Sequence, residues 1–201
     1  MSKQPRNIPT DRQLVDPVLG GDTPAFGEII SRTEGLVAQI VCKMISNEED
    51  RKDIVQDIYL KVFHHLKGFR FQSKLSTWVA QIAYNACSSQ LQKRRLLLHV
   101  LPDSDMDGAG PCGGRQHMVR AAEETDGSIL KKELTGILQA EIGRLPPLYQ
   151  TLISLYHEEE LTYQEMAQIT GLPEGTVKSY LFRARKMLKE KLLSKYKMWK
   201  L

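Results

Sequence analysis

Cysteines, histidines and long apolar runs are all scarce in this chain of 201 residues. The three cysteines, Cys42, Cys87 and Cys112, show no C-x-x-C spacing and are too few for a disulfide-stapled secreted domain. We therefore expect a reducing, cytoplasmic setting. No stretch of about 18 apolar residues occurs, so we expect the chain not to insert into a membrane. The first 21 residues are polar and contain three prolines, which does not fit a signal peptide.

The five histidines are scattered and do not form a set of metal ligands. His64 and His65 are neighbours on a predicted helix and cannot both face one site. Cys112 and His117 lie near each other without companion ligands. We therefore expect no metal site, no cofactor and no catalytic residue, so the chain is not predicted to be an enzyme.

The formal net charge of +4 conceals segments of opposite sign. Residues 66–95 contain six Lys and Arg and no acid, and residues 173–201 contain nine Lys and Arg against two acids. Between these basic segments, residues 96–127 carry six acids against two arginines. Two separate basic segments favour a polyanionic partner that the chain contacts at two places.

Residues 96–127 also have no apolar period, and glycines cluster around Pro111. We interpret this segment as a flexible linker. A long internal loop is the alternative, but loops beyond about 12–15 residues are uncommon inside compact domains. The predicted fold is all-α, with two small helical domains, residues 1–95 and residues 128–201, on either side of the linker.

In the first domain, apolar residues from Phe26 to Met44 keep helical spacing, and Asn47 is expected to cap a second helix. The apolar face of this second helix consists of Ile54, Val55, Ile58, Tyr59, Val62, Phe63 and Leu66. Its opposite face carries Asp53, Gln56, Asp57 and Leu60. This opposite face is either a solvated surface or a docking surface for a basic partner.

A basic loop with interleaved aromatic residues follows, and it opens a helix that we expect to run to about Lys93. Ser76 or Thr77 is the predicted cap of this helix. Cations can follow a phosphate backbone while aromatic rings stack on unpaired bases, so the loop is a candidate site for single-stranded nucleic acid. The alternative is a small core beneath the loop, which Phe69 and Trp78 could equally well form.

The second domain contains the signals of a helix-turn-helix. Thr162-x-x-Glu165 is a capping box, Gly171 suits a left-handed turn, and Pro173 precedes a basic helix. Such a helix enters the major groove with polar and basic side chains. An amphipathic hairpin with a solvated basic face is the alternative.

Four motifs in this order carry a family likeness. D-I-V-Q-D-I-Y at residues 53–59 and F-x-S-K-L-S-T-W-x-x-x-I-A-x-N at residues 71–85 resemble region 2 of bacterial sigma factors. L-T-Y-x-E-M-A at residues 161–167 and G-T-V-K-S-x-L-F-R-A-R at residues 175–185 resemble region 4. With only these two regions, the chain resembles an extracytoplasmic-function sigma factor of RNA polymerase.

The resemblance implies three sets of site residues. Those for docking on core RNA polymerase are Asp53, Gln56, Asp57 and Leu60. Those for the single-stranded −10 element are Lys61, Phe69, Arg70, Lys74, Trp78, Ile82 and Asn85. The positions that match a pocket for a flipped base are Lys61, His65, Phe69, Ile82 and Asn85. Those for the duplex −35 element are Gly175, Thr176, Lys178, Ser179, Phe182, Arg183 and Lys186.

The resemblance also implies partners: core RNA polymerase, promoter DNA and, in the usual family manner, an anti-sigma protein. Four positions depart from the pattern, because Ser89 and Gln92 stand where the family often has Asp and Arg, Tyr180 stands where Arg is frequent, and His65 stands at a position where a small residue is usual. The alternative function is a helix-turn-helix regulator that acts without binding core polymerase. That alternative leaves the acidic helix face and the aromatic loop without a role.

Overall fold

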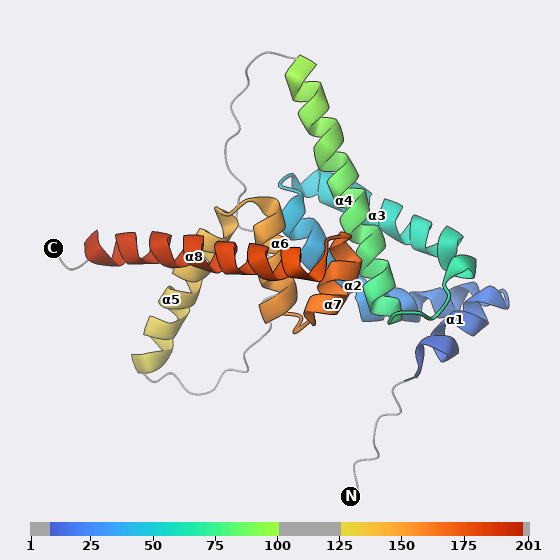
Figure 1. Cartoon of the computed structure of the whole chain (residues 1–201). Helices are drawn as coiled ribbons and strands as arrows, with labels where there is room; N and C mark the ends of the chain where they lie inside the picture. The colour runs from blue at the N-terminus through green and yellow to red at the C-terminus, as the bar shows by residue number, and fades with distance from the viewer. Residues whose placement is uncertain (1–8, 101–125, 199–201) are drawn as a thin grey trace, which may run out of the picture.

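The computed structural model describes residues 9–100 and 126–198, and within these ranges the chain is helical and contains no strand (Figure 1). The all-α prediction is therefore confirmed. The elements are α1 (Asp11–Leu19), η1 (Thr23–Ala25), α2 (Phe26–Met44), α3 (Glu48–His65), η2 (Leu66–Gly68), α4 (Leu75–Val100), α5 (Asp126–Gly143), α6 (Pro147–His157), α7 (Tyr163–Thr170) and α8 (Glu174–Met198).

Several helix ends follow directly from local sequence signals. The side chain of Asn47 accepts hydrogen bonds from the backbone N–H groups of Glu49 and Asp50, at 2.8 and 3.2 Å, and so caps α3. Thr162 and Glu165 form the expected reciprocal capping box at the start of α7. Gly171 ends α7 with φ of +70°, a left-handed conformation that glycine adopts without a steric penalty. The helix-turn-helix prediction rests on these signals, and the structure contains both helices and the turn.

Helix α1 lies within the N-terminal stretch for which the sequence analysis predicted no element. Thr10 and Gln13 form a capping box there, and Leu14, Val15 and Val18 are buried. The T-x-x-Q spacing before three apolar residues was the signal that could have predicted this helix.

The start and end of α4 differ from the prediction. The helix begins at Leu75, so neither Ser76 nor Thr77 caps it. Instead, the backbone N–H of Leu75 donates to Oδ2 of Asp11 on α1, at 2.8 Å. The helix continues to Val100, beyond Lys93, and thus includes the first residues of the predicted linker. Most of that linker, residues 101–125, lies outside the described residues.

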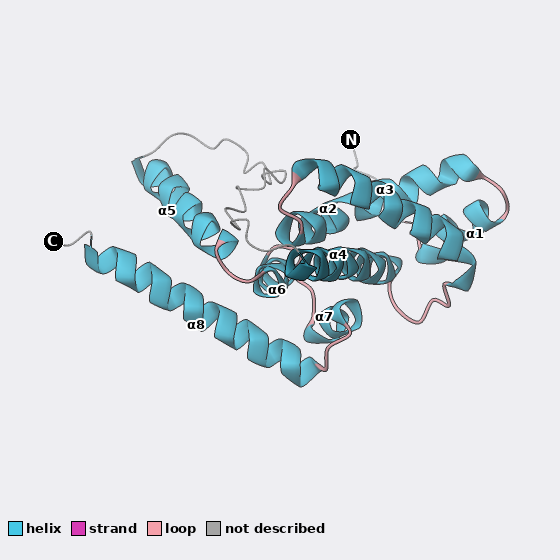
Figure 2. Cartoon of the chain, turned by 90° about the horizontal axis from the view of Figure 1, so that it is seen from above, coloured by secondary structure: helices cyan, strands magenta, loops and turns pink. Residues whose placement is uncertain are grey.

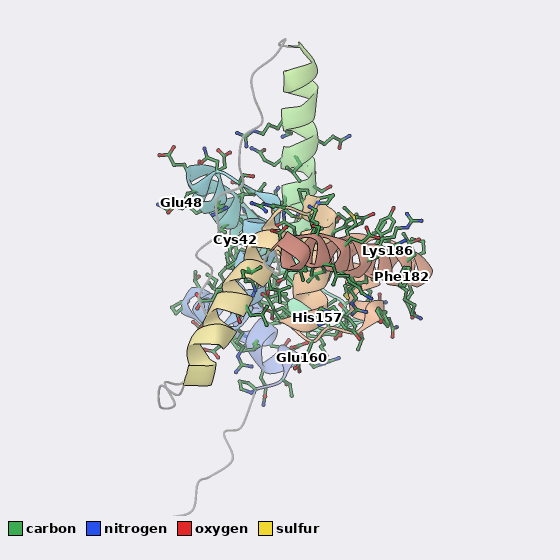
Figure 3. The ribbon with its side chains drawn as sticks, turned by 90° about the vertical axis from the view of Figure 1, so that its left-hand side faces the viewer. Cys42, Glu48, His157, Glu160, Phe182 and Lys186 are labelled. Carbon is green, nitrogen blue, oxygen red and sulfur yellow. The ribbon has the colours of Figure 1, made fainter. Side chains whose placement is uncertain are left out.

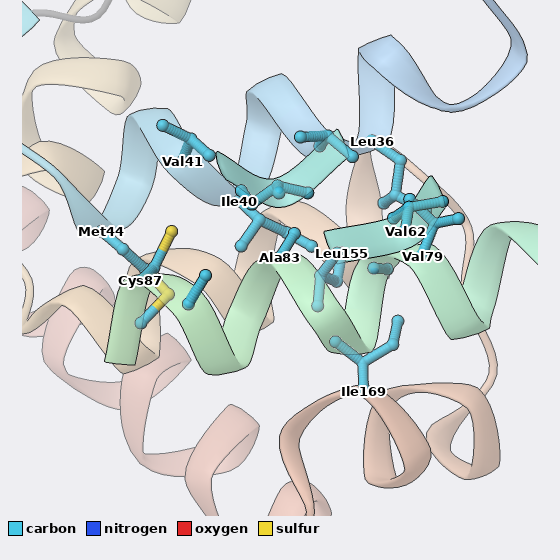
Figure 4. Packing of buried hydrophobic residues seen from close by; sticks show 14 of the residues in the cluster. Leu36, Ile40, Val41, Met44, Val62, Val79, Ala83, Cys87, Leu155 and Ile169 are labelled. Atoms are coloured by element: carbon cyan, nitrogen blue, oxygen red, sulfur yellow. The ribbon is translucent and has the colours of Figure 1, made fainter. Parts of the chain in front are cut away.

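The helices of the two predicted domains pack on one another. Helix α4 lies between α3 and α7, and α6 packs against α2 (Figure 2). Leu155 of α6 and Ile169 of α7 approach Val79 and Ala83 of α4 in one continuous apolar cluster (Figure 4). The sequence divides the chain into two units, but the apolar core extends across both.

Two cysteines lie on this helical framework. Cys87 on α4 is buried as a free thiol, and burial raises its pKa to about 12. This thiol therefore stays protonated near neutral pH. Cys42 on α2 is half-buried.

Candidate nucleic-acid interface

The acidic face of α3, formed by Asp53, Gln56, Asp57 and Leu60, is exposed along its whole length. It lies on α3, which is on the other side of α4 from α7 and α8 (Figure 2). Leu60 is 57% exposed. Phe63, predicted to lie on the buried face, is also exposed, although its ring contacts that of Phe26 edge-on at 5.2 Å. The surface therefore combines carboxylates with two exposed apolar side chains.

A cavity of about 240 Å³ opens between α3 and α4. We call it the α3–α4 cavity, and it is lined by Lys61, His65, Ile82, Asn85, Ala86 and Ser89. It unites a cation, an amide and an apolar wall, and it is somewhat smaller than the ~300–1,000 Å³ pockets that hold drug-sized ligands. The helical register therefore brings together four of the five residues expected around a flipped base.

Phe69, the fifth residue, lies elsewhere. It is only 7% exposed, and its ring contacts those of Phe71 and Trp78, with centroids 4.7 and 5.2 Å away. Phe69 thus forms the small core beneath the aromatic loop, which we define as residues 69–74. Phe69 belongs to this small core and does not line the α3–α4 cavity.

A second cavity, of about 300 Å³, is lined by residues of the aromatic loop and of the start of α4. Phe69, Arg70 and Trp78 line it together with Gln168 of α7. Beside it, Lys74 Nζ lies 2.8 Å from Glu165 Oε1, also on α7. This hydrogen bond raises the pKa of Lys74 and lowers the pKa of Glu165. Four of the predicted −10 residues therefore lie beside the helix-turn-helix in this arrangement.

The predicted reading surface of α8 is exposed except at Thr176, which is half-buried. Phe182 is 69% exposed (Figure 3). Arg183 and Lys186 are exposed near it, and Gly175 and Ser179 lie exposed toward the helix start. Short polar, basic and apolar groups are the groups that contact base edges and thymine methyls in a major groove.

Two members of this surface are held by neighbouring groups. Lys178 Nζ lies 2.7 Å from Glu174 Oε1, which raises the pKa of the lysine. Tyr180, which stands where the family often has Arg, packs edge-on against Tyr149, and the Arg183 guanidinium lies 5.9 Å from the Tyr180 ring centroid. At position 180 this chain therefore has an aromatic ring in place of the family's usual cation, and this ring packs within the domain and contacts Arg183.

A further cluster on the helix-turn-helix was not predicted. The rings of Tyr156 and Tyr163 stack at 5.3 Å, and the Arg185 guanidinium lies 4.7 Å from the Tyr156 centroid. A hydrogen bond with Tyr163, and a second one with Arg185, lower the pKa of Tyr156. Arg185 also lies within 3.3 Å of Nε2 of His157. No spacing signal reveals this cluster, because its members come from three different helices.

The described ranges 9–100 and 126–198 contain no group of three or more potential metal-binding side chains. Within the same ranges no helix has the length and apolar character needed to cross a membrane.

Comparison with known proteins shows which family this fold belongs to. Residues 29–96 match Sigma-70 region 2, and residues 135–188 match Sigma-70, region 4. The chain is 33% identical over 187 residues to the ECF RNA polymerase sigma-E factor of Haemophilus influenzae, covering 91% of this chain and 95% of the relative. It is 32% identical over 189 residues to the protein of the same name in Escherichia coli (strain K12), covering 91% and 94%. The chain therefore belongs to the extracytoplasmic-function (ECF) sigma factors of RNA polymerase.

Two solved structures share the fold. One is the sigma factor RpoE of Bartonella quintana in complex with the anti-sigma factor NepR, with a TM-score of 0.62, 21% identity and coverage of 83% and 96%. The other is CnrH in complex with the cytosolic domain of CnrY, with a TM-score of 0.60, 21% identity and coverage of 92% and 97%.

Proposed function

We propose that this chain is a sigma factor that docks on core RNA polymerase, recognises −35 and −10 promoter elements and promotes initiation. The observation that carries this proposal is the α3–α4 cavity beside a basic aromatic loop. A regulator that reads only duplex DNA has no use for a cavity of this kind, whereas a protein that opens DNA needs a place for an extruded base.

At the −10 element, the α3–α4 cavity would receive one unpaired base. Extruding a base costs a few kcal/mol, so the cavity has to return a comparable interaction energy. The Asn85 amide can both donate and accept hydrogen bonds at a base edge, and Ile82 offers an apolar wall. Lys61 adds a cation at the rim for the phosphate backbone. The lining supports selection of a base rather than binding of any apolar ligand.

At the −35 element, α8 would lie in the major groove. Arg183 is a bidentate donor suited to guanine, and Phe182 suits a thymine methyl. Gly175, Thr176 and Ser179 mark the end of the helix at which the backbone approaches the DNA most closely. Lys178 and Lys186 would hold phosphates, which fixes register rather than sequence.

The acidic face of α3 would dock on a basic surface of core polymerase. All three roles are positional, so the chain would act without catalysis of its own and without a cofactor. It would work in the cytoplasm, where bacterial polymerase and chromosome meet. The complex of RpoE with the anti-sigma factor NepR supports regulation of this chain by an anti-sigma protein.

Reconstitution tests the proposal. The chain is mixed with core polymerase, and run-off transcription is measured on a promoter mapped from transcript 5′ ends after overexpression. We expect promoter-specific transcripts only when both components are present. Binding to −35 duplex without any association with core polymerase would instead establish the helix-turn-helix regulator.

The ion pair between Lys74 and Glu165 leads to a prediction. Glu165 uses Oε2 for the Thr162 capping box and Oε1 for Lys74. Glu165→Gln keeps the cap, because Gln also serves in a capping box, but removes the charge that holds Lys74. We expect the free variant to bind single-stranded −10 DNA up to about fivefold more tightly at low salt. Lys74 is exposed, and ion pairs with solvent-screened members contribute about 0.2–1 kcal/mol.

Fluorescence anisotropy measures this gain, which high salt should erase. Glu174→Gln is the control, because it removes the partner of Lys178 on α8 and leaves Lys74 untouched. Unchanged or weaker binding by the Glu165 variant would show that the pair does not restrain Lys74.

A further inference from the structure

Helix α1 lies outside both regions matched by the sigma-factor families, which begin at residues 29 and 135. It is nevertheless tied firmly to the rest of the first domain. Leu14, Val15 and Val18 enter the core, and Arg32 Nη1 of α2 donates to the Pro9 carbonyl at 3.1 Å. This anchoring gives α1 a fixed position from which its polar side chains can act.

The first polar contact is the one between Asp11 and the start of α4. A helix leaves its first N–H groups without internal partners, and Lys74, which precedes the helix, has a side chain that cannot accept a hydrogen bond. Asp11 Oδ2 accepts from the Leu75 N–H at 2.8 Å across 64 positions of sequence. Its carboxylate also stands at the positive end of the α4 dipole. Asp11 therefore caps, from another helix, the helix that follows the aromatic loop.

The second contact is between Arg12 and the loop itself. Its guanidinium carbon lies 5.0 Å from the ring centroid of Phe71. Phe71 has φ of +55°, a left-handed conformation that costs a bulky residue energy and persists only when neighbouring groups hold it. The ring of Phe69 also contacts that of Phe71, with centroids 4.7 Å apart. Arg12 and Phe69 thus fix a residue that would otherwise relax to another backbone conformation.

We propose that Asp11 and Arg12 are positioning residues for promoter opening, which hold the aromatic loop and the start of α4 in the conformation that captures the −10 strand. The proposal rests on the proposed function of the loop. Because α4 also carries Ile82 and Asn85, fixing its first turn fixes the loop relative to the α3–α4 cavity. A DNA strand that contacts both the loop and the cavity loses less conformational entropy on binding when the loop is already fixed in place.

The test uses the chain reconstituted with core polymerase and a fluorescent single-stranded oligonucleotide that carries the −10 segment of a mapped promoter. Asp11→Ala should weaken oligonucleotide binding about tenfold. The reason is that loss of a strong helix cap destabilises the conformation of the loop and α4 that binds the strand. Asp11→Asn should bind within about twofold of wild type, because Asn caps as well as Asp. Asp16→Ala, an exposed change on the same helix, should have no effect.

Core-polymerase affinity and the affinity for −35 duplex serve as readouts that the loop should not influence. We expect both to be unchanged in all three variants, which separates positioning of the loop from general unfolding. Wild-type binding by Asp11→Ala, or equal losses for the −10 strand and the −35 duplex, would overturn the proposal. A wild-type holoenzyme that does not bind the oligonucleotide at all would instead refute the proposed function.

Discussion

Replacing Asp57 with lysine is expected to weaken binding to core RNA polymerase by about 100-fold or more. Asp57 lies near the middle of the acidic face of α3, between exposed Asp53 and Leu60. A like charge placed against a basic partner surface costs several kcal/mol, and each 1.4 kcal/mol is a factor of ten in affinity. Removing the carboxylate alone, as in Asp57→Ala, should produce a smaller loss in the same direction.

The measurement is titration of labelled core polymerase with the chain, at two salt concentrations. Glu28→Lys is a matched control, since it changes the net charge equally but lies on α2 rather than on α3, where it removes the pair with Arg32. Binding of isolated −35 duplex should be the same in both variants. Normal core affinity in the Asp57 variant would exclude this face as the docking surface.

Replacing Arg183 with alanine is expected to weaken binding of the −35 duplex by about 5- to 100-fold, since a bidentate contact to guanine contributes about 1–3 kcal/mol of discrimination. Arg183 is exposed next to Phe182, and the Tyr180 ring lies beneath its guanidinium. We expect the affinity for the cognate duplex to decrease, while the affinity for unrelated DNA changes little. The ratio of the two affinities is therefore the quantity to measure.

Lys189→Ala provides the contrast, because it removes one positive charge from another face of the same helix. This change should lower both affinities only slightly and equally, and it should make the salt dependence shallower. If Arg183→Ala behaves like Lys189→Ala, Arg183 contacts phosphate and does not read sequence.

Local signals explain why the helix-turn-helix could be predicted from sequence. The capping box of Thr162 and Glu165 and the left-handed Gly171 are decided within a few residues of chain. Ile82 and Asn85, which the resemblance assigned to a base pocket, both line the α3–α4 cavity. The region 2 and region 4 motifs then defined the family, which the comparisons confirmed.

Contacts between distant segments could not be predicted in the same way. Phe69 was a candidate both for the base pocket and for a small core, and only its burial against Phe71 and Trp78 distinguishes them. The stack of Tyr156 on Tyr163 and the pair between Lys74 and Glu165 each join side chains from different helices. Periodicity within one helix carries no information about such pairs.

By itself, the sequence determined the all-helical class, the family and most residues of the three candidate surfaces. Those properties follow from caps, turns and helical spacing, which act over a few residues. Only the tertiary structure decided that α1 caps α4 through Asp11, that Phe69 belongs to the core, and that α7 lies against the aromatic loop. These contacts depend on how apolar faces pack in three dimensions, and a linear pattern does not specify which faces meet.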